Sequence, residues 1–256
     1  MCIRDSSTSE EVLNELSSKS DLVKLVLKFR SISKLLNTYI NSLPKQLDKS
    51  TNRIHTEYVQ TIASTGRLSS INPNLQNIPI RTNRGREVRK AFIARNKDYF
   101  LMAADYSQIE LRIIASLSNE ENMINAFKKN EDIHASTASA VFNVPINQVS
   151  KEQRSNAKVV NFGIIYGVSA FGLSNQTKLN RTESKELIEK YFEKYPKLKQ
   201  YINNQISFAR NNGYVETVLG RRRYLKDINS QNSVVRGSAE RNAINAPVQG
   251  LSLIHI

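Results

Sequence analysis

Helical periodicity dominates one long stretch of this chain, residues 119–212, and is interrupted only near Pro145 and Pro196. Strand patterns lie on either side of that stretch and do not alternate with its helices. A doubly wound sheet needs regular alternation of strands and helices, so the pattern favours an α+β fold over that architecture.

The remaining segments carry shorter patterns. Ser9, followed by acidic residues, is a typical helix start. Gly213 fits the position just after a helix C-terminus, and Pro247 indicates the end of the last helix. In chain order, we expect a helical region at 7–42, a loop at 43–52, a short strand at 54–62, a turn-rich segment at 64–85, a strand at 100–104, a helix at 108–118, a hairpin at 214–225 and a last helix at 233–245.

The net charge points to a polyanionic partner. The 256 residues carry a formal charge of +14, and the sequence pI is near 9.8. Cations that neutralise phosphates release condensed counterions, which favours nucleic acid as the partner, although a solvated basic surface has the same composition. The single cysteine, Cys2, excludes an internal disulfide framework and suits a reducing compartment. No segment has the pattern of a secretory signal or of a membrane span.

An acidic residue follows an apolar run in LMAADYSQIELRIIASLS (101–118). Asp105 stands where the expected strand ends, so its carboxylate would be held rigidly at the surface. That placement suits Mg²⁺, which takes oxygen ligands and shares its shell with substrate phosphates. A strand-ending aspartate that caps the following helix is the alternative.

Two cations and two aromatic residues recur every four residues in KEQRSNAKVVNFGIIYG (151–167). Arg154, Lys158, Phe162 and Tyr166 therefore share one broad face of a helix. Charges for phosphates and rings for stacking would suit a nucleoside triphosphate. An amphipathic helix with a solvated basic end and a buried aromatic end gives the same pattern. Two glycines in the segment weaken this alternative, because they lower helix stability and need another reason.

Three further segments carry weaker signals. TGRLSSINPNLQNIPIR (65–81) contains Arg67 with serines and amides that hydrogen-bond well to sugar and phosphate, as an ordinary loop also does. GRRRYL (220–225) places three arginines on the expected hairpin, which is more often a general basic patch. ERNAINAPVQG (240–250) repeats polar residues at steps of four that could contact nucleic-acid edges or form the wet face of a helix.

In combination and in this order, six motifs resemble the polymerase region of family A DNA polymerases, the bacterial DNA polymerase I group. The resemblance covers about residues 9–250 and rests on TGRLSS with NPNLQNIPIR, DYSQIELRIIASLS, DIHASTA (132–138), RSNAKVVNFGIIYG, GYVETVLGRRRY and ERNAINAPVQG. It implies an α+β palm-and-fingers arrangement, with an antiparallel palm sheet and a largely helical fingers subdomain.

The resemblance also implies the reaction and its cofactor. The reaction is template-directed DNA synthesis, in which the nucleotidyl group of a dNTP is transferred to a primer 3′-hydroxyl and pyrophosphate leaves, with two Mg²⁺ ions in the complete enzyme. Asp105 and Lys158 match catalytic residues of the family. The Asp105 carboxylate and the Tyr106 backbone carbonyl match metal ligands.

Binding residues follow from the same motifs. Glu110 matches the side chain that crowds the sugar 2′ position and excludes ribonucleotides, and Phe162 in place of Tyr implies discrimination against dideoxynucleotides. The residues that match dNTP contacts are Glu110, His134, Arg154, Lys158, Phe162 and Tyr166. Those that match primer–template DNA contacts are Arg67, Asn74, Gln76, Asn77, Arg241, Asn245 and Gln249.

Subdomain bounds are expected by the same analogy. They are a non-native leader at 1–6, the base of the thumb at 7–50, the first part of the palm at 51–118, the fingers at 119–230, a returning palm helix at 231–250 and a non-native tail at 251–256. The resemblance further implies a monomer without a membrane partner in the bacterial cytoplasm, with an organelle or phage origin left open.

One motif of the family is missing from this sequence. The second catalytic aspartate belongs to a later His-Asp-Glu motif, and no acidic residue follows Glu240 in this chain. We therefore expect a truncated fragment that does not extend a primer by itself. A non-catalytic nucleic-acid-binding fragment is the alternative from another class. A single-subunit RNA polymerase is a further alternative, which the bulk of Glu110 disfavours.

Overall fold

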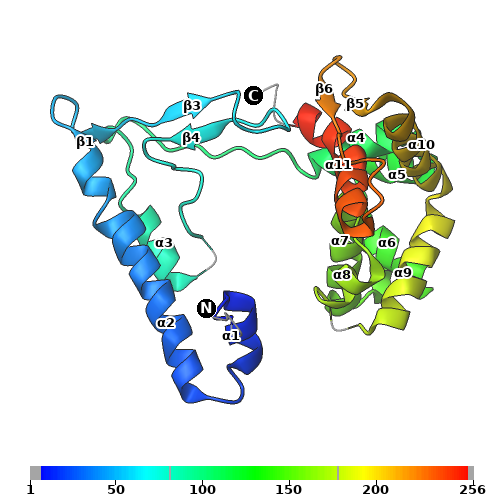
Figure 1. Ribbon diagram of the computed structural model, residues 1–256, viewed down its shortest axis with the longest axis horizontal. Coiled ribbons are helices and arrows are strands. Elements are labelled where there is room, and N and C mark those ends of the chain that lie inside the picture. Colours follow the sequence, from blue (N-terminus) through cyan, green and yellow to red (C-terminus); the bar gives the residue numbers. More distant parts are fainter. Residues whose placement is uncertain (1–6, 81, 178, 253–256) are drawn as a thin grey trace. The chain divides into compact units, whose positions relative to one another are not determined.

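The computed structural model describes residues 7–80, 82–177 and 179–252 (Figure 1). The expected leader at 1–6, with Cys2, and most of the expected tail, 253–256, lie outside these residues. The chain forms two compact units, Met1–Gln60 with Leu68–Ala103 and Thr61–Arg67 with Ala104–Ile256. None of the helices in the described ranges combines the length and the apolar character that a membrane crossing needs.

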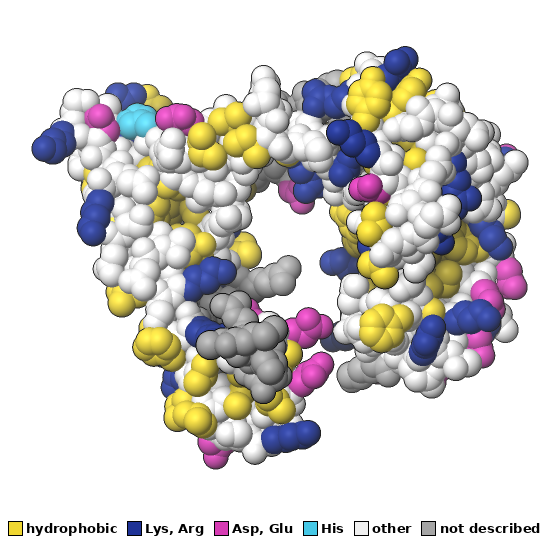
Figure 2. All heavy atoms as spheres, in the orientation of Figure 1, with side chains coloured by type: hydrophobic (Ala, Val, Ile, Leu, Met, Phe, Trp, Pro, Cys, Tyr) yellow, Lys and Arg dark blue, Asp and Glu magenta, His cyan; other side chains and the backbone are white. Residues whose placement is uncertain are grey.

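The described residues of the first unit form short strands and three α-helices. Its elements are α1 (Glu10–Leu16), α2 (Asp21–Leu35), the π-turn η1 (Leu36–Ile40), the 3₁₀ turn η2 (Leu43–Gln46), β1 (Leu47–Asp48), β2 (Arg53–Ile54), β3 (Glu57–Val59), β4 (Ser69–Ile71) and α3 (Asn83–Arg89). Ser9 accepts a hydrogen bond from the backbone N–H of Val12 and caps α1, as the sequence predicted. Hydrophobic side chains remain exposed along α2 (Figure 2).

The second unit is mostly helical. Its elements are α4 (Ile109–Ser118), α5 (Glu121–Lys128), α6 (Ile133–Phe142), the 3₁₀ turn η3 (Ile146–Gln148), α7 (Lys151–Ile165), α8 (Ala170–Ser174), α9 (Arg181–Lys194), α10 (Pro196–Asn212), β5 (Tyr214–Glu216), β6 (Arg222–Tyr224) and α11 (Ser233–Ser252). The expected breaks are confirmed, because η3 follows Pro145 and α10 begins at Pro196. Gly213 ends α10 with φ of 76°.

The core of the second unit surrounds α4. Leu111 and Ile114 on α4 are fully buried, and this helix packs against α5, α7, α10 and α11 (Figure 1). Helix α6 also packs against α7 and α9. Since α6 and α7 carry His134 and the Arg154 motif, this packing fixes the candidate site residues on a rigid helical body.

Strands are fewer and shorter than expected. In the part of the chain that the structure describes, three separate antiparallel pairs form, β1 with β2, β3 with β4 and β5 with β6, so the fold is mostly helical with small antiparallel sheets. The strand expected at 100–104 is wrong: these residues adopt no regular structure, and the Phe100 side chain is 90% exposed. No strand in the described ranges pairs with this segment, and an apolar run without a hydrogen-bonding neighbour does not form a ladder.

Three other expected boundaries also differ. The strand expected at 54–62 divides into β2 and β3, and the loop expected at 43–52 contains η2 and β1. The end of the last helix is not at Pro247 as expected, because α11 continues to Ser252 with this proline inside it. Proline removes one helical hydrogen bond, and burial of the neighbouring Ala246 and Val248 offsets that loss.

Candidate nucleotide and nucleic-acid site

Helix α7 presents Arg154 and Lys158, the two cations of the motif, to solvent. Ser150 and Gln153 form a capping box at its N-terminus, and Ala157 and Val160 are buried on its inner face. The Arg154 and Lys158 side chains project from the exposed part of the helix. Arg154 Nε donates a hydrogen bond to Asp132 Oδ2 at 2.6 Å.

The aromatic end of the motif is only partly buried. Phe162 packs against the core, while Tyr166 follows the helix as its C-terminal cap and is 37% exposed. Arg154, Lys158 and Phe162 therefore follow the amphipathic alternative, and the partly exposed Tyr166 departs from it.

Packing accounts for the two glycines of α7 and its C-terminus. A Cβ on Gly163 would lie 2.7 Å from Val168 Cγ1, and a Cβ on Gly167 would lie 2.8 Å from Arg241 Cγ. Gly167 also has φ of 65°, which disfavours other residues. These glycines therefore permit close packing and are no separate evidence for a ligand.

Glu110 lies at the centre of a polar cluster. Its Oε2 accepts a hydrogen bond from the Tyr166 hydroxyl at 2.6 Å, and its Oε1 accepts one from Arg67 Nη2 at 3.2 Å. The Gln249 side chain also hydrogen-bonds to Tyr166. We call these four residues the Glu110 cluster; they come from four separate sequence motifs.

Electrostatics tie the members of the Glu110 cluster to one another. The Glu110 side chain is 11% exposed, so Arg67 compensates a largely desolvated carboxylate. Burial, together with the hydrogen bond to Glu110, raises the pKa of the Tyr166 hydroxyl above its ordinary value. The hydroxyl therefore stays a proton donor to Glu110 at neutral pH.

His134 on α6 is buried beside α7. Its ring centroid lies 5.7 Å from that of Phe162, and its Nδ1 lies 3.0 Å from Asn161 Nδ2. The amide nitrogen donates to an unprotonated Nδ1 in this arrangement. Asn161 also contacts Thr137 Oγ1, which lies 3.0 Å from the Tyr195 hydroxyl.

Sequence reasoning missed Asn161, Thr137 and Tyr195 as members of this buried network. The only local signal was a polar Asn inside the apolar run VVNFG. An asparagine that is fully buried needs hydrogen-bond partners, and the partners come from distant residues.

The ionisation of His134 gives a prediction for stability. Burial is the main cause that lowers its pKa, to about 4, so the folded state holds the ring neutral. The unfolded chain takes up this proton near its ordinary pKa, and stability is therefore lost as the pH falls from about 6.5 towards 4. Urea unfolding measures the effect. Between about pH 7 and pH 5, the free energy of unfolding of the unchanged chain should fall by about 1 kcal/mol more than that of the His134→Gln variant, after allowance for solvent screening.

The exposed His55 supplies the control. Substitution His55→Gln removes an imidazole from an exposed position and should leave the free energy of unfolding at pH 7 unchanged. Identical pH profiles for the wild type and His134→Gln would contradict a buried neutral His134.

Asp105 and Tyr106 lie in an exposed segment without regular structure. The rigid strand end that was expected to hold Asp105 is absent, because residues 100–104 form no strand. Among the described residues, no group of three or more His, Cys, Asp or Glu side chains gathers at a possible metal position. The Asp105 carboxylate and the Tyr106 carbonyl are oxygen ligands that suit one Mg²⁺ ion, with phosphate oxygens as its other ligands. They are too few to hold two ions.

Arg67, which was expected to contact DNA, lies in the Glu110 cluster, and the other residues of that prediction fall into two sets. Asn74, Gln76 and Asn77 lie in the first unit, where two of these side chains organise their own loop. Gln76 Nε2 donates to the Leu68 carbonyl at 3.0 Å, and Asn74 Oδ1 accepts from the Gln76 backbone N–H at 3.0 Å. These contacts hold the loop in one conformation.

The second set lies on α11. Arg241 is exposed, while Asn245 Oδ1 is buried without a hydrogen-bond partner in the described part of the chain. Gln249 joins the Glu110 cluster, so the polar side of α11 is not simply a solvated face.

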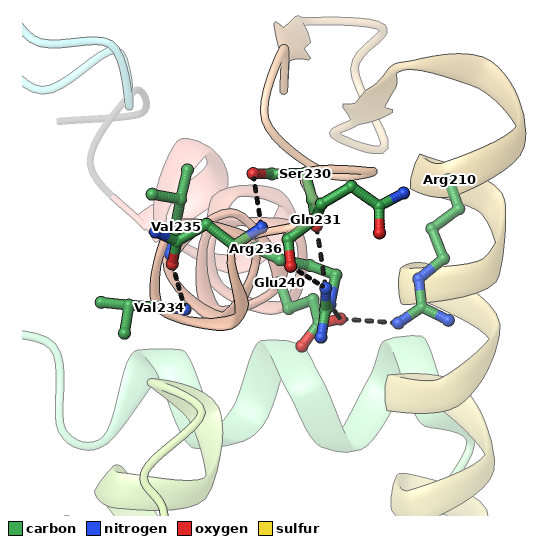
Figure 3. Close-up of polar contacts among 8 residues, drawn as sticks. Arg210, Ser230, Gln231, Val234, Val235, Arg236 and Glu240 are labelled. Carbon is green, nitrogen blue, oxygen red and sulfur yellow. Dashed lines mark hydrogen bonds and ion pairs between the residues drawn. The ribbon is translucent and has the colours of Figure 1, made fainter.

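An ionic contact positions the N-terminal half of α11 (Figure 3). Glu240 Oε1 accepts from Arg210 Nη2 of α10 at 2.6 Å and lies 3.8 Å from Arg236 Nε. Arg236 Nη1 also donates to the Ser230 carbonyl at 2.8 Å. Because Glu240 immediately precedes Arg241, this contact fixes the helical turn that carries the exposed arginine.

Comparisons with known proteins agree with the resemblance in the sequence. A model of DNA polymerase family A matches residues 3–253. DNA polymerase I of Caldicellulosiruptor bescii is 50% identical over 244 residues, which are 95% of this chain and 29% of the relative. DNA polymerase I of Pseudomonas aeruginosa is 51% identical over 245 residues, which are 95% of this chain and 27% of the relative.

A solved structure is similar in fold and sequence. It is the POL domain of Pol1 from M. smegmatis in complex with DNA primer-template and dNTP, with a TM-score of 0.84 and 43% identity. The match covers 97% of this chain and 44% of the solved one. This chain therefore spans less than a third of the length of the two curated relatives.

Proposed function

The chain belongs to DNA polymerase family A, and from this premise we propose that it carries the dNTP-selecting part of a template-directed DNA polymerase. The observation that carries the proposal is the Glu110 cluster, in which Arg67 and Tyr166 donate hydrogen bonds to one carboxylate and Gln249 hydrogen-bonds to Tyr166. The Pol1 domain of M. smegmatis, which is similar to this chain, was solved with primer-template DNA and a dNTP.

The triphosphate is assigned to the exposed cations of α7. Arg154 and Lys158 project from successive turns of one helix, so both can contact one run of phosphates. Lys158 is also the residue that we assign to protonation of the leaving pyrophosphate. His134 lies beside Phe162 and is neutral, which permits hydrogen bonding but adds no charge.

The sugar and base are assigned to the other end of the helix. Phe162 and Tyr166 supply ring faces for the sugar and the base. Glu110 is held by two hydrogen bonds and cannot swing away without leaving its partners, which suits exclusion of a ribose 2′-hydroxyl. This role favours a DNA polymerase over a single-subunit RNA polymerase.

Asp105 and the Tyr106 carbonyl would hold Mg²⁺ with the phosphates of the substrate. Bound there, the ion supplies neutralisation of phosphate charge and activation of a hydroxyl nucleophile. Asp105 lies in an exposed segment before α4, where a carboxylate is accessible to such a complex. The donors of the described residues suit a single ion, so we propose that this chain does not complete the two-ion site by itself.

Primer–template DNA is assigned to both units. Arg67, Arg241, Asn245 and Gln249 would contact the DNA from the second unit, and the loop at 74–77 from the first. We propose the thumb base at 7–50, palm at 51–118, fingers at 119–230 and returning palm helix at 231–250. We further propose that the chain acts as a monomer in the bacterial cytoplasm, in DNA replication or repair.

A primer-extension assay tests the proposal. We expect the purified chain to bind labelled primer–template DNA in a salt-dependent manner and to extend no primer with Mg²⁺ and dNTPs. Full-length DNA polymerase I of Pseudomonas aeruginosa serves as the positive control. Template-directed incorporation of nucleotides by the chain alone would contradict the proposal that it does not complete the two-ion site by itself. Absence of DNA binding would contradict the proposed function.

A non-catalytic nucleic-acid-binding role is the second candidate for this chain. The environment of Asp105 favours this role, because its exposed carboxylate belongs to no cluster of three or more potential metal ligands in the described ranges. DNA binding that does not respond to any dNTP would support this role over dNTP selection.

A further inference from the structure

We propose that Asp132 is a positioning residue that holds the Nε edge of Arg154, so that the two terminal nitrogens of the guanidinium face the triphosphate. The inference rests on the proposed function, because it takes Arg154 as a phosphate ligand. It adds a residue that binds no part of the substrate itself.

The carboxylate of Asp132 has two sets of contacts. Its Oδ1 accepts the backbone N–H groups of His134 at 3.0 Å and Ala135 at 3.2 Å, and so caps the N-terminus of α6. Its Oδ2 accepts from Arg154 Nε of α7 at 2.6 Å. The cap fixes the carboxylate on one helix, and the fixed carboxylate orients a side chain of the next.

Guanidinium geometry makes this contact selective. Arginine has five N–H donors in a rigid plane, and a contact through Nε leaves donors on both terminal nitrogens. These nitrogens can form paired hydrogen bonds with phosphate oxygens. The Arg154 side chain is 47% exposed, so a ligand can reach it while the Nε contact remains.

Charge also distinguishes the positioning role from a simple ion pair. Burial raises the pKa of Asp132, but the hydrogen bonds from Arg154 and the α6 backbone outweigh it and keep the group anionic. An anion near a triphosphate repels it unless a cation compensates. Asp132 should therefore favour dNTP binding while Arg154 is present and oppose it once Arg154 is removed.

A double-mutant cycle tests this change of sign. Asp132→Asn retains a capping oxygen for α6 and removes the charge that holds Arg154. We expect it to weaken binding of mant-dATP, followed by fluorescence titration, about 5-fold in the wild type. In an Arg154→Ala background the same substitution should tighten binding about 2-fold.

Two controls separate positioning from folding. Glu121→Gln breaks an ion pair to Lys197 of the same 2.6 Å length in the same unit and should leave dATP affinity unchanged. Asp132→Ser retains the α6 cap and should repeat the result of Asp132→Asn, with melting temperatures that match the wild type within a few degrees.

The outcomes distinguish the inference from its premise. An equal loss in both backgrounds means a structural role only, and tighter binding in the wild-type background means that Asp132 merely occupies Arg154 in the free chain. Either result overturns the inference alone. If Arg154→Ala leaves dATP affinity unchanged, the proposed function of α7 fails, and the inference fails with it.

Discussion

A chain that carries both Arg154→Ala and Lys158→Ala is expected to bind a dNTP at least about 100-fold more weakly than the unchanged chain. Hydrogen bonds to charged groups contribute about 1.5–3 kcal/mol each, and each 1.4 kcal/mol is about a tenfold change in affinity. Both side chains are exposed on α7, so their removal should not disturb the core. Equilibrium titration with dATP measures the effect.

The matched control removes the same charge elsewhere in the second unit. Arg181 and Lys190 are exposed on α9, and Arg181→Ala with Lys190→Ala lowers the net charge equally. This variant should retain dATP affinity within about twofold. Equal losses in the two variants would show that net charge, and not the position on α7, governs binding.

Asn161→Ala is expected to lower the free energy of unfolding by about 2–4 kcal/mol, because it leaves buried polar groups without partners. Asn161 is fully buried on α7 and contacts His134 Nδ1 and Thr137 Oγ1. Urea unfolding, followed by far-UV circular dichroism, measures the change.

Asn203→Ala is its control, since Asn203 is exposed on α10 and the substitution raises helix propensity. It should leave stability unchanged or raise it by a few tenths of a kcal/mol. If Asn161→Ala is no more destabilising than Asn203→Ala, the buried network does not stabilise the contact between α6 and α7.

Helix positions followed from the sequence where local chemistry decides them. Ser9 caps α1, Pro196 begins α10 and Gly213 ends it. Each of these depends on a residue whose own backbone or side chain fixes the structure nearby. The expectation of a helix over 108–118 is also confirmed, by α4.

Features that depend on distant partners could not be predicted in the same way. The apolar run before Asp105 has strand character, but a strand forms only with a paired neighbour, and the described chain provides none for it. Pro247 indicates a helix end in the local sequence, whereas the packing of α11 that carries the helix past it depends on other elements.

The candidate site shows the same division. The spacing of Arg154, Lys158, Phe162 and Tyr166 was sufficient to place them on one helix. The hydrogen bond from Tyr166 to Glu110 required the folding of α4 against α7, and the contact of Asp132 with Arg154 spans two helices. Periodicity gives no information on such contacts.

The most direct test of dNTP selection is a DNA-dissociation measurement without chemistry. The chain is bound with Mg²⁺ to a primer–template whose primer ends in a dideoxynucleotide, and the release of labelled DNA is followed with each of the four dNTPs. Selection at α7 predicts that the dNTP complementary to the templating base slows release about tenfold or more, and that Arg154→Ala abolishes the effect. Equal release rates with all four dNTPs would contradict the account.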